Sequence, residues 1–497
     1  MRLSQLLQPA DLLDQPTDND VDVAGLALDS RHVGPGFLFA ALPGQHASGA
    51  QFVAEAVQRG AAVVLCGLDD KIPESSAQVL RVAQPRLTLA RMAARFYGPQ
   101  PKHVVAVTGT SGKSSVVDYV RQIWNHCGLN GASIGTLGAI TAHQHDDTNL
   151  TTPDCITLHQ QLQKLAAAGV QRVAIEASSH GLEMQRLHAV NIFTGAFTNL
   201  SRDHLDFHPT MEAYLAAKLR LFREIVPAGA PVVLNADIPE YQTLRSVCLS
   251  RGQRILSFGR QGHDICLKNM VADAKGLTLE WRVMGMNTQT RLNLVGDFQA
   301  WNVMTALALV MAEPRMPLPQ ILAFLPQLQA VPGRLQHVGE KSHAGGVAQV
   351  FVDYAHKPEA LATVLKTLRP LVTGNGKLWV VFGCGGNRDK GKRPLMGRIA
   401  TQLADKVVIT DDNPRTEEPA AIRAEILAGC DDAHKVSEAD NRRAAIEESI
   451  GQLGAGDILV IAGKGHETGQ IVGDTELPFD DAAVAAECLA HTLRGAA

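Results

Sequence analysis

The stretch HVVAVTGTSGKSSVVDYVRQIW, residues 103–124, decides the fold of this chain. An apolar, strand-like run leads into a glycine-containing loop and then into a helical pattern, which is the context that a phosphate-binding P-loop requires. Glycines let backbone N–H groups turn toward phosphate oxygens, a lysine adds positive charge, and the next hydroxyl can reach Mg²⁺. The predicted phosphate-binding residues are Gly109, Thr110, Ser111, Gly112, Lys113, Ser114 and Ser115. The full motif has a glycine where Val107 stands, so a plain glycine turn before a helix stays as the alternative.

Strand-like runs and helical patterns alternate downstream of this loop. The runs VQRVAIEAS, NIFTGAFTNL and APVVLNAD continue the first block, and AQVFVDYA, GKLWVVFGCGG, ADKVVITDD and GDILVIAGKG form a second one. Such alternation predicts parallel sheets with crossover helices. Proline and glycine clusters near RFYGPQP and LQAVPGR mark the breaks. We therefore expect an α/β fold with three domains: residues 1–97, a central P-loop parallel-sheet domain at 98–331, and a C-terminal Rossmann-like α/β domain at 332–497.

Length and composition agree with several globular domains. The chain has 497 residues, of which 45% are hydrophobic and 19% charged, so wholesale disorder is excluded. The net charge is −4 without runs of like charge, so we expect no nucleic-acid or membrane partner. The eight cysteines form no C-x-x-C pair, and no signal peptide or membrane span is evident. These features predict a cytoplasmic protein, expected to be a monomer, that acts on small molecules.

Two residues downstream of the P-loop are candidates for catalysis. Glu176 ends an apolar strand, where α/β sheets place ligand-binding groups, so it could hold Mg²⁺ or be a solvated strand end. Lys218 falls on the apolar stripe of the helical segment MEAYLAAKLRLFREIV. It could snorkel to water, or it could lie near the reaction centre with a pKa lowered by desolvation. The preceding loop, TNLSRDHLDFHP, holds the metal-capable residues Asn199, Asp203, His204, Asp206 and His208.

Polar loops follow the four strands of the second block. Parallel strands would bring these loops to one edge of the sheet, where they could converge on a ligand, although ordinary turns have similar compositions. Arg415 and Glu467 together suit a ligand with both a carboxylate and an ammonium group. The loops contain Asp353 and His356; Gly383, Gly385, Gly386, Asn387 and Arg388; Asp412, Asn413, Pro414 and Arg415; and Gly463, Lys464, Gly465, His466 and Glu467.

The motifs TGTSGKSS, EASSHG, TNLSRDHLD, DYAHKP, GCGGNRDKGKRP and DDNPRTEEP, taken in order, resemble the Mur ligases of bacterial peptidoglycan synthesis. The DNPR string, residues 412–415, resembles that of members that add diaminopimelate. This resemblance implies an ATP- and Mg²⁺-dependent ligase that adds meso-diaminopimelate to UDP-N-acetylmuramoyl-L-alanyl-D-glutamate through an acyl phosphate. The alternatives are a lysine-adding ligase or folylpolyglutamate synthetase, and a P-loop nucleotide switch whose output is binding.

The resemblance also assigns roles to residues at matching positions. It implies that Lys218 is carbamylated and holds a second Mg²⁺ with Glu176 and His204, with Ser114 on the nucleotide's Mg²⁺. ATP would be bordered, besides the P-loop, by Asn302, Arg334 and Asp353. The UDP substrate would contact Leu28, Ser30, Gln45, His46, Ala47, Thr151, Thr152, Ser178 and Arg186. Diaminopimelate would contact Arg388, Asp412, Asn413, Pro414, Arg415, Gly463 and Glu467. Met184 departs from the family pattern, which has a glutamine there, and Asn387 replaces an acid.

Overall fold

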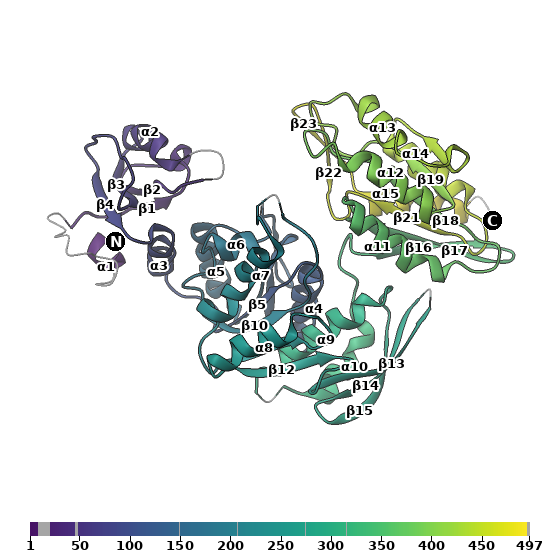
Figure 1. Ribbon diagram of the computed structural model, residues 1–497, viewed down its shortest axis with the longest axis horizontal. Coiled ribbons are helices and arrows are strands. Elements are labelled where there is room, and N and C mark those ends of the chain that lie inside the picture. The colour runs from purple at the N-terminus through teal and green to yellow at the C-terminus, as the bar shows by residue number, and fades with distance from the viewer. Residues whose placement is uncertain are drawn as a thin grey trace. The chain divides into compact units, whose positions relative to one another are not determined.

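Parallel sheets form the framework of the protein (Figure 1). The computed structural model describes residues 1–7, 20–44, 48–148, 150–205, 207–273, 275–314 and 316–494. The chain forms two compact units. The first unit comprises Met1–Lys268, Trp281–Thr288 and Trp301–Phe324, and the second comprises Asn269–Glu280, Gln289–Ala300 and Leu325–Ala497.

The N-terminal part contains a small parallel sheet, which the short apolar runs of its sequence did not by themselves predict. Its strands are adjacent in chain order: β1 (Gly25–Ala27), β2 (Phe37–Ala40), β3 (Ala61–Gly67) and β4 (Gln78–Val82). Its helices are α1 (Leu3–Leu6), α2 (Val53–Gln58) and α3 (Pro85–Tyr97). Leu38 and Leu65 on one face and Phe39 and Val64 on the other are buried, so both faces of the sheet are covered.

The central sheet places the P-loop strand between two parallel neighbours, as predicted. Strand β5 pairs with β9 on one side and β10 on the other. The eleven strands lie in the order β15-β14-β13-β12-β11-β10-β5-β9-β6-β7-β8. Their bounds are β5 His103–Thr108, β6 Gly131–Gly135, β7 Gly138–Ile140, β8 His145–Asp146, β9 Arg172–Glu176, β10 Ile192–Phe197, β11 Pro231–Asn235, β12 Arg254–Gly259, β13 Ile265–Asp273, β14 Gly276–Val283 and β15 Met286–Leu292.

Helices follow these strands, as crossover connections require. Helix α4 (Lys113–His126) begins directly after the glycine loop, and α7 (Met211–Arg220) carries Lys218. The predicted helix over 211–226 changes to a π-helix, η4, at Leu221–Ile225. The others are α5 (Cys155–Ala167), α6 (Ser179–Glu183), α8 (Tyr241–Ser250), α9 (Phe298–Met311) and α10 (Leu318–Phe324).

The C-terminal sheet contains the four predicted strands, all parallel, as β17 (Gly346–Asp353), β18 (Leu378–Phe382), β19 (Lys406–Ile409) and β21 (Ile458–Ala462). The order is β16-β17-β21-β18-β19-β20, with antiparallel β16 (Gln336–His343) and parallel β20 (Val436–Glu438) at the edges. Around it lie α11 (Pro358–Leu368), α12 (Lys392–Leu403), α13 (Pro419–Leu427), α14 (Arg442–Gln452), α15 (Asp481–Arg494) and the hairpin β22 (Gly469–Val472) and β23 (Thr475–Pro478).

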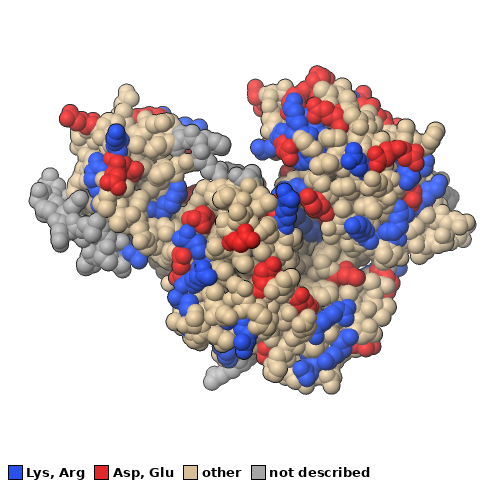
Figure 2. Space-filling view, in the orientation of Figure 1, with Lys and Arg blue, Asp and Glu red and all other residues tan. Residues whose placement is uncertain are grey.

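The charged side chains of both signs are interspersed on the face drawn in Figure 2, so neither sign dominates it. All eight cysteines are free thiols. No helix within the described ranges combines the length and apolar character that crossing a membrane requires.

Candidate active site

The glycines of the P-loop occupy positions that no other residue fits. Gly109 has φ 145° and Gly112 has φ 86°. A Cβ atom at Gly109 would lie 2.0 Å from Thr198 Oγ1, and one at Gly112 would lie 2.3 Å from Asn302 Oδ1. Both backbone conformation and lack of space therefore demand glycine here. The contact with Asn302 also places this predicted ATP residue, from α9, beside the start of α4.

The turn that follows β10 holds the P-loop in shape. Thr110 N donates to Asn199 O at 2.9 Å, and Ser111 N donates to Asn199 Oδ1 at 2.9 Å. The hydroxyl of Thr198 donates to Ser111 O at 2.7 Å. The loop conformation is thus set by a neighbouring strand end rather than by the loop alone. The role of Asn199 was not evident from the sequence, which placed it only among metal-capable residues.

Two lysines meet at the same backbone carbonyl. Lys113 Nζ donates to Gly109 O at 3.0 Å and to Thr110 O at 2.9 Å, and Lys218 Nζ donates to Gly109 O at 2.8 Å. Lys218 is only 1% exposed, so the snorkelling interpretation is wrong: its ammonium points into the interior. Burial lowers the pKa of Lys218 well below its usual value, and the nearby charge of Lys113 lowers it further, against the opposing effect of Asp203.

The carboxylate predicted from the sequence is buried beside the predicted UDP-substrate residues. Glu176, at the end of β9, is 1% exposed and accepts from Thr136 N at 2.8 Å. Thr152 donates through its hydroxyl to Glu176 O at 2.7 Å and accepts from Ser178 N at 2.9 Å. Arg186 Nη1 donates to Thr152 O at 2.8 Å. The structure therefore brings Thr152, Ser178 and Arg186 together.

Neighbouring contacts complete this group. Thr136 donates through its hydroxyl to that of Thr151 at 3.1 Å, which adds the remaining predicted threonine. Arg186 Nη2 also lies 3.1 Å from the sulfur of Met184, the residue that departs from the family pattern. The side chain at position 184 therefore still contacts the predicted substrate arginine.

The metal-capable loop places aromatic and histidine rings next to α7. His204, with φ 53°, has its ring 4.9 Å from that of His180 and 6.1 Å from that of Tyr214. Asp206 lies outside the described residues. No group of three or more His, Cys, Asp or Glu side chains in the described part of the chain is arranged to hold a metal. A site with few protein ligands still fits Mg²⁺, because this ion keeps several waters and usually binds through one or two carboxylates and substrate phosphates.

The predicted uridine-end residues are only partly described. Ser30, at the start of a short 3₁₀ helix (Ser30–His32), is buried and donates to Glu55 Oε2 at 2.7 Å. Leu28 is half-buried against the N-terminal core. Gln45, His46 and Ala47 lie outside the described residues.

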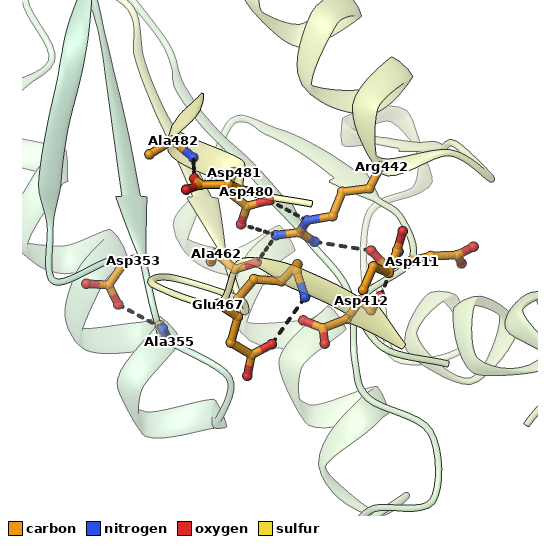
Figure 3. A network of polar contacts seen from close by, with 12 residues as sticks. Asp353, Ala355, Asp411, Asp412, Arg442, Ala462, Glu467, Asp480, Asp481 and Ala482 are labelled. Atoms are coloured by element: carbon orange, nitrogen blue, oxygen red, sulfur yellow. Dashed lines mark hydrogen bonds and ion pairs between the residues drawn. The ribbon is translucent and has the colours of Figure 1, made fainter. Parts of the chain in front are cut away.

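Asp353 and Arg334, the other predicted ATP residues, belong to the second unit. Asp353 Oδ1 accepts from Ala355 N at 2.8 Å, as Figure 3 shows, and Oδ2 accepts from Leu335 N at 2.7 Å. Burial raises the pKa of Asp353 to about 6, and the positive charge of Arg334 opposes that rise. The Arg334 guanidinium lies 4.9 Å from the centroid of the Tyr354 ring, a cation–π contact.

The loops after β19 and β21 meet through a buried lysine. Lys464 is fully buried, and its Nζ donates to Asn413 Oδ1 at 3.0 Å, Glu467 Oε2 at 3.1 Å and Gly469 O at 2.6 Å. Asn413 Nδ2 donates to the same Glu467 oxygen at 2.8 Å. The structure therefore joins Asn413 and Glu467, as predicted, and adds Lys464 between them. The sequence showed Lys464 only as a loop residue, since an isolated lysine between glycines is normally exposed.

Arg415 is fixed by its backbone on one side and by its side chain on the other. Its φ is 53°, its N donates to Ile471 O at 3.0 Å, and its Nη1 donates to Gly386 O at 3.0 Å. A Cβ atom at Gly385 would lie 3.0 Å from Arg415 Nη1, so the guanidinium packs closely against the backbone of the loop after β18. Arg388, in the same loop as Gly385, is exposed.

Asp412, Pro414 and Gly463 lie in the contact region of these loops and are buried. A Cβ atom at Gly463, where φ is 116°, would lie 2.6 Å from Asp412 Oδ2. The predicted diaminopimelate residues of the two loops therefore lie close together at the carboxyl ends of parallel strands, the usual position of ligand sites in such sheets.

Comparisons with known proteins show the family of this chain. Three family models match the chain: Mur ligase family, catalytic domain, at residues 22–97; Mur ligase middle domain at 107–310; and Mur ligase, glutamate ligase domain, at 333–465. A solved structure of a UDP-N-acetylmuramoyl-L-alanyl-D-glutamate–2,6-diaminopimelate ligase is similar, with TM-score 0.66 and 32% identity over 96% of this chain and 98% of its own. MurF from Acinetobacter baumannii, at 19% identity over 90% and 91% of the two chains, shares the fold with TM-score 0.59.

Relatives are similar over nearly the whole length. Proteins from Mesorhizobium japonicum and Brucella melitensis, each named UDP-N-acetylmuramoyl-L-alanyl-D-glutamate–2,6-diaminopimelate ligase, are 47% identical. The matches cover 93% of this chain and 94% of the first relative, and 95% of both chains for the second. By sequence and by fold, this chain belongs to the Mur ligase family.

Proposed function

We propose that this protein joins meso-diaminopimelate to the D-glutamate carboxylate of UDP-N-acetylmuramoyl-L-alanyl-D-glutamate at the expense of ATP. The observation that carries the proposal is the group formed by Asn413, Lys464 and Glu467, next to which the Arg415 guanidinium donates to Asn413 O at 3.4 Å. Together these residues offer both signs of charge at one sheet edge. A guanidinium can bind a carboxylate through two hydrogen bonds, and a carboxylate can bind an ammonium group. The names of the 47% identical relatives support the same substrates.

The proposed reaction has two steps, formation of an acyl phosphate and formation of the amide. A carboxylate oxygen of D-glutamate attacks the γ-phosphorus of ATP, the bond to the bridging oxygen breaks, and ADP leaves an acyl phosphate. The amine of diaminopimelate then attacks the acyl carbon, phosphate leaves, and the amine loses a proton. The protein aligns the reactants and neutralises charge through Lys113 and the amides of the glycine loop. Bound Mg²⁺ supplies further positive charge, with Ser114 and Glu176 as the side chains able to face it.

Lys218 is proposed to carry a carbamate. Its lowered pKa favours the neutral amine, which adds to CO₂ with loss of one proton. The product is an anion, so it could ligate a second Mg²⁺ with Glu176 and His204. Burial beside Gly109, with Lys113 nearby, supports this proposal because an anion there would be paired with a cation.

The remaining assignments follow the three matched domains. Residues 1–97 would bind the uridine end, 98–331 ATP, and 332–497 the amino acid. Ser30, Thr151, Thr152, Ser178 and Arg186 would contact the nucleotide-linked substrate. The enzyme would work in the cytoplasm, where UDP-linked precursors and ATP are present, and as a monomer; light scattering would detect any stable dimer.

An amino-acid panel tests the function directly. The full-length protein is mixed with ATP, Mg²⁺ and the UDP-muramoyl dipeptide, and then with meso-diaminopimelate, L-lysine or L-glutamate singly. We expect phosphate release and a product mass increase with meso-diaminopimelate only. Equal use of L-lysine would make the protein a lysine-adding ligase. Phosphate release that does not depend on any added amino acid would support a nucleotide switch.

A further inference from the structure

A buried arginine lies beneath the two loops of the proposed amino-acid site. Arg442 is the first residue of α14, after the N-cap Asn441, and Asp481 is the first residue of α15. Both side chains are fully buried. Arg442 Nε and Nη2 donate to Asp481 Oδ1 and Oδ2, each at 2.7 Å, as Figure 3 shows. This bidentate pair fixes the plane of the guanidinium.

The same guanidinium reaches the backbone of both loops. Nη1 donates to Asp411 O at 3.2 Å, and Nη2 donates to Ala462 O at 3.0 Å. Asp411 immediately precedes Asp412, the first residue of the DNPR string, and Ala462 is the last residue of β21, just before Gly463. One planar group therefore ties together the two points from which the loops leave the sheet.

A lysine could not replace this arrangement. Holding one carboxylate and two separated carbonyls requires several donors in a fixed plane, which arginine has and the single ammonium of lysine lacks. Burial lowers the pKa of Arg442, but the charge and hydrogen bonds of Asp481, followed by the charges of Asp412 and Glu467, outweigh that effect and raise the pKa above its usual value. The cation thus supports loops that themselves carry carboxylates.

We infer that Arg442, oriented by Asp481, is a positioning residue that holds the loops after β19 and β21 at the separation needed to bind the amino-acid substrate. It does not touch the substrate itself; it acts through Asp411 O and Ala462 O. The inference rests on the proposed function for the identity of the amino acid. The competing explanation is that the pair serves stability alone.

Two conservative substitutions separate these explanations. Arg442→Lys keeps the charge and most of the volume, and Asp481→Asn is nearly isosteric. A misplacement of binding groups by about 1 Å can lower the efficiency of an enzyme about 100-fold. We therefore expect the KM for meso-diaminopimelate to rise about 10-fold to 100-fold in both variants. The KM for ATP and for the UDP-linked substrate should change less than about twofold. Arg443→Lys is the matched control, because Arg443, the next residue on α14, makes exposed ion pairs with Glu447 and Glu487.

Hydrogen exchange of the folded Asp481→Asn protein gives a readout that does not depend on the substrate. Amides of residues 412, 413, 415 and 463–467 should exchange faster than in the wild type, while those of residues 109–115 should not change. A lower melting temperature with unchanged KM and unchanged exchange would overturn the inference, and so would failure of both variants to fold, since either result assigns the pair to stability alone. If the wild-type protein does not use meso-diaminopimelate as a substrate, that result would contradict the proposed function instead. The hydrogen-exchange result would still decide whether Arg442 and Asp481 position the loops.

Discussion

Lys218 shows how a residue at an anomalous position can indicate an unusual environment. A lysine on an apolar helical stripe has two explanations, and the structure excludes the exposed one because Lys218 Nζ is buried against Gly109 O. We expect Lys218→Ala to lose nearly all ligase activity, since the variant would lack the anion that the proposed carbamate supplies. Activity should be partly restored by added acetate or formate, measured as phosphate release. Full activity without any added acid would contradict the carbamate.

Lys113 is expected to serve the nucleotide rather than the fold. Losing one charged partner in a desolvated site costs on the order of 2 to 5 kcal/mol, so Lys113→Ala should lower kcat/KM for ATP roughly 30-fold or more, at about 1.4 kcal/mol per tenfold. The melting temperature should stay close to that of the wild type. Lys102→Ala, an exposed lysine just before β5, is the control. Normal ATP turnover in Lys113→Ala would remove the P-loop from the mechanism.

The buried carboxyl group of Asp353 should make the stability of the protein depend on pH. Its pKa is raised from 3.8 to about 6, so between these values the folded state binds more protons than the unfolded state. Stability from this group is therefore present at low pH and is lost as pH rises through about 6, by on the order of 3 kcal/mol. Urea unfolding of wild type and Asp353→Asn from pH 4 to 7.5 should show the variant gaining relative stability as pH rises. If the free energies of unfolding of the two proteins changed in parallel with pH, burial would not raise the pKa of Asp353.

Among the elements, the loop after β19 is proposed to determine which amino acid the enzyme adds. Diaminopimelate differs from lysine by one carboxylate, so a selective site needs a cation, and leaving that cation unpaired disfavours lysine. Arg415→Ala should raise the KM for meso-diaminopimelate roughly 30-fold or more, because a lost charged partner costs about 2 to 5 kcal/mol. The KM for ATP should scarcely change. Steady-state kinetics with each substrate varied in turn would show this, and an unchanged diaminopimelate KM would refute the assignment.

The elements that the sequence predicted are those with continuous apolar runs. Strands β17, β18, β19 and β21 are buried on both faces, with Val380 packing on one side and Val381 on the other, so each strand is mostly apolar. Antiparallel β16 was missed because it is an edge strand with mixed polarity, in which only alternate positions can be buried. The π-helical end of the Lys218 segment was missed because one extra residue per turn leaves little trace in the periodicity.

In the candidate site, too, some residues could be predicted from the sequence and others could not. Glycine loops and strand-end acids were evident because backbone conformation and topology restrict which residues can stand there. Lys464 and Arg442 were not, because their roles depend on partners from distant parts of the chain: Asn413 for the first, and Asp481 and Ala462 O for the second. A single sequence gives no sign that two such segments meet.

At the level of the whole molecule, the two compact units each have their own buried core. We therefore expect thermal unfolding to show two transitions. The proposed diaminopimelate residues all lie in the second unit, so the amino acid should stabilise that transition alone. At 100 times its Kd a ligand contributes about 2.7 kcal/mol, which for about 150 to 250 residues raises a melting temperature by roughly 5 to 10 °C.

Calorimetry with two variants makes this last prediction specific. Val380→Ala removes buried volume from the core of the second unit, so the transition that it lowers belongs to that unit. Meso-diaminopimelate should raise the same transition in the wild type but not in Arg415→Ala. Because the ligand binds only the folded state, a site built from second-unit residues cannot shift the other transition unless the units unfold together. An equal shift of both transitions would therefore show that the two units form one cooperative body, and no shift at saturating ligand would place the amino-acid site elsewhere.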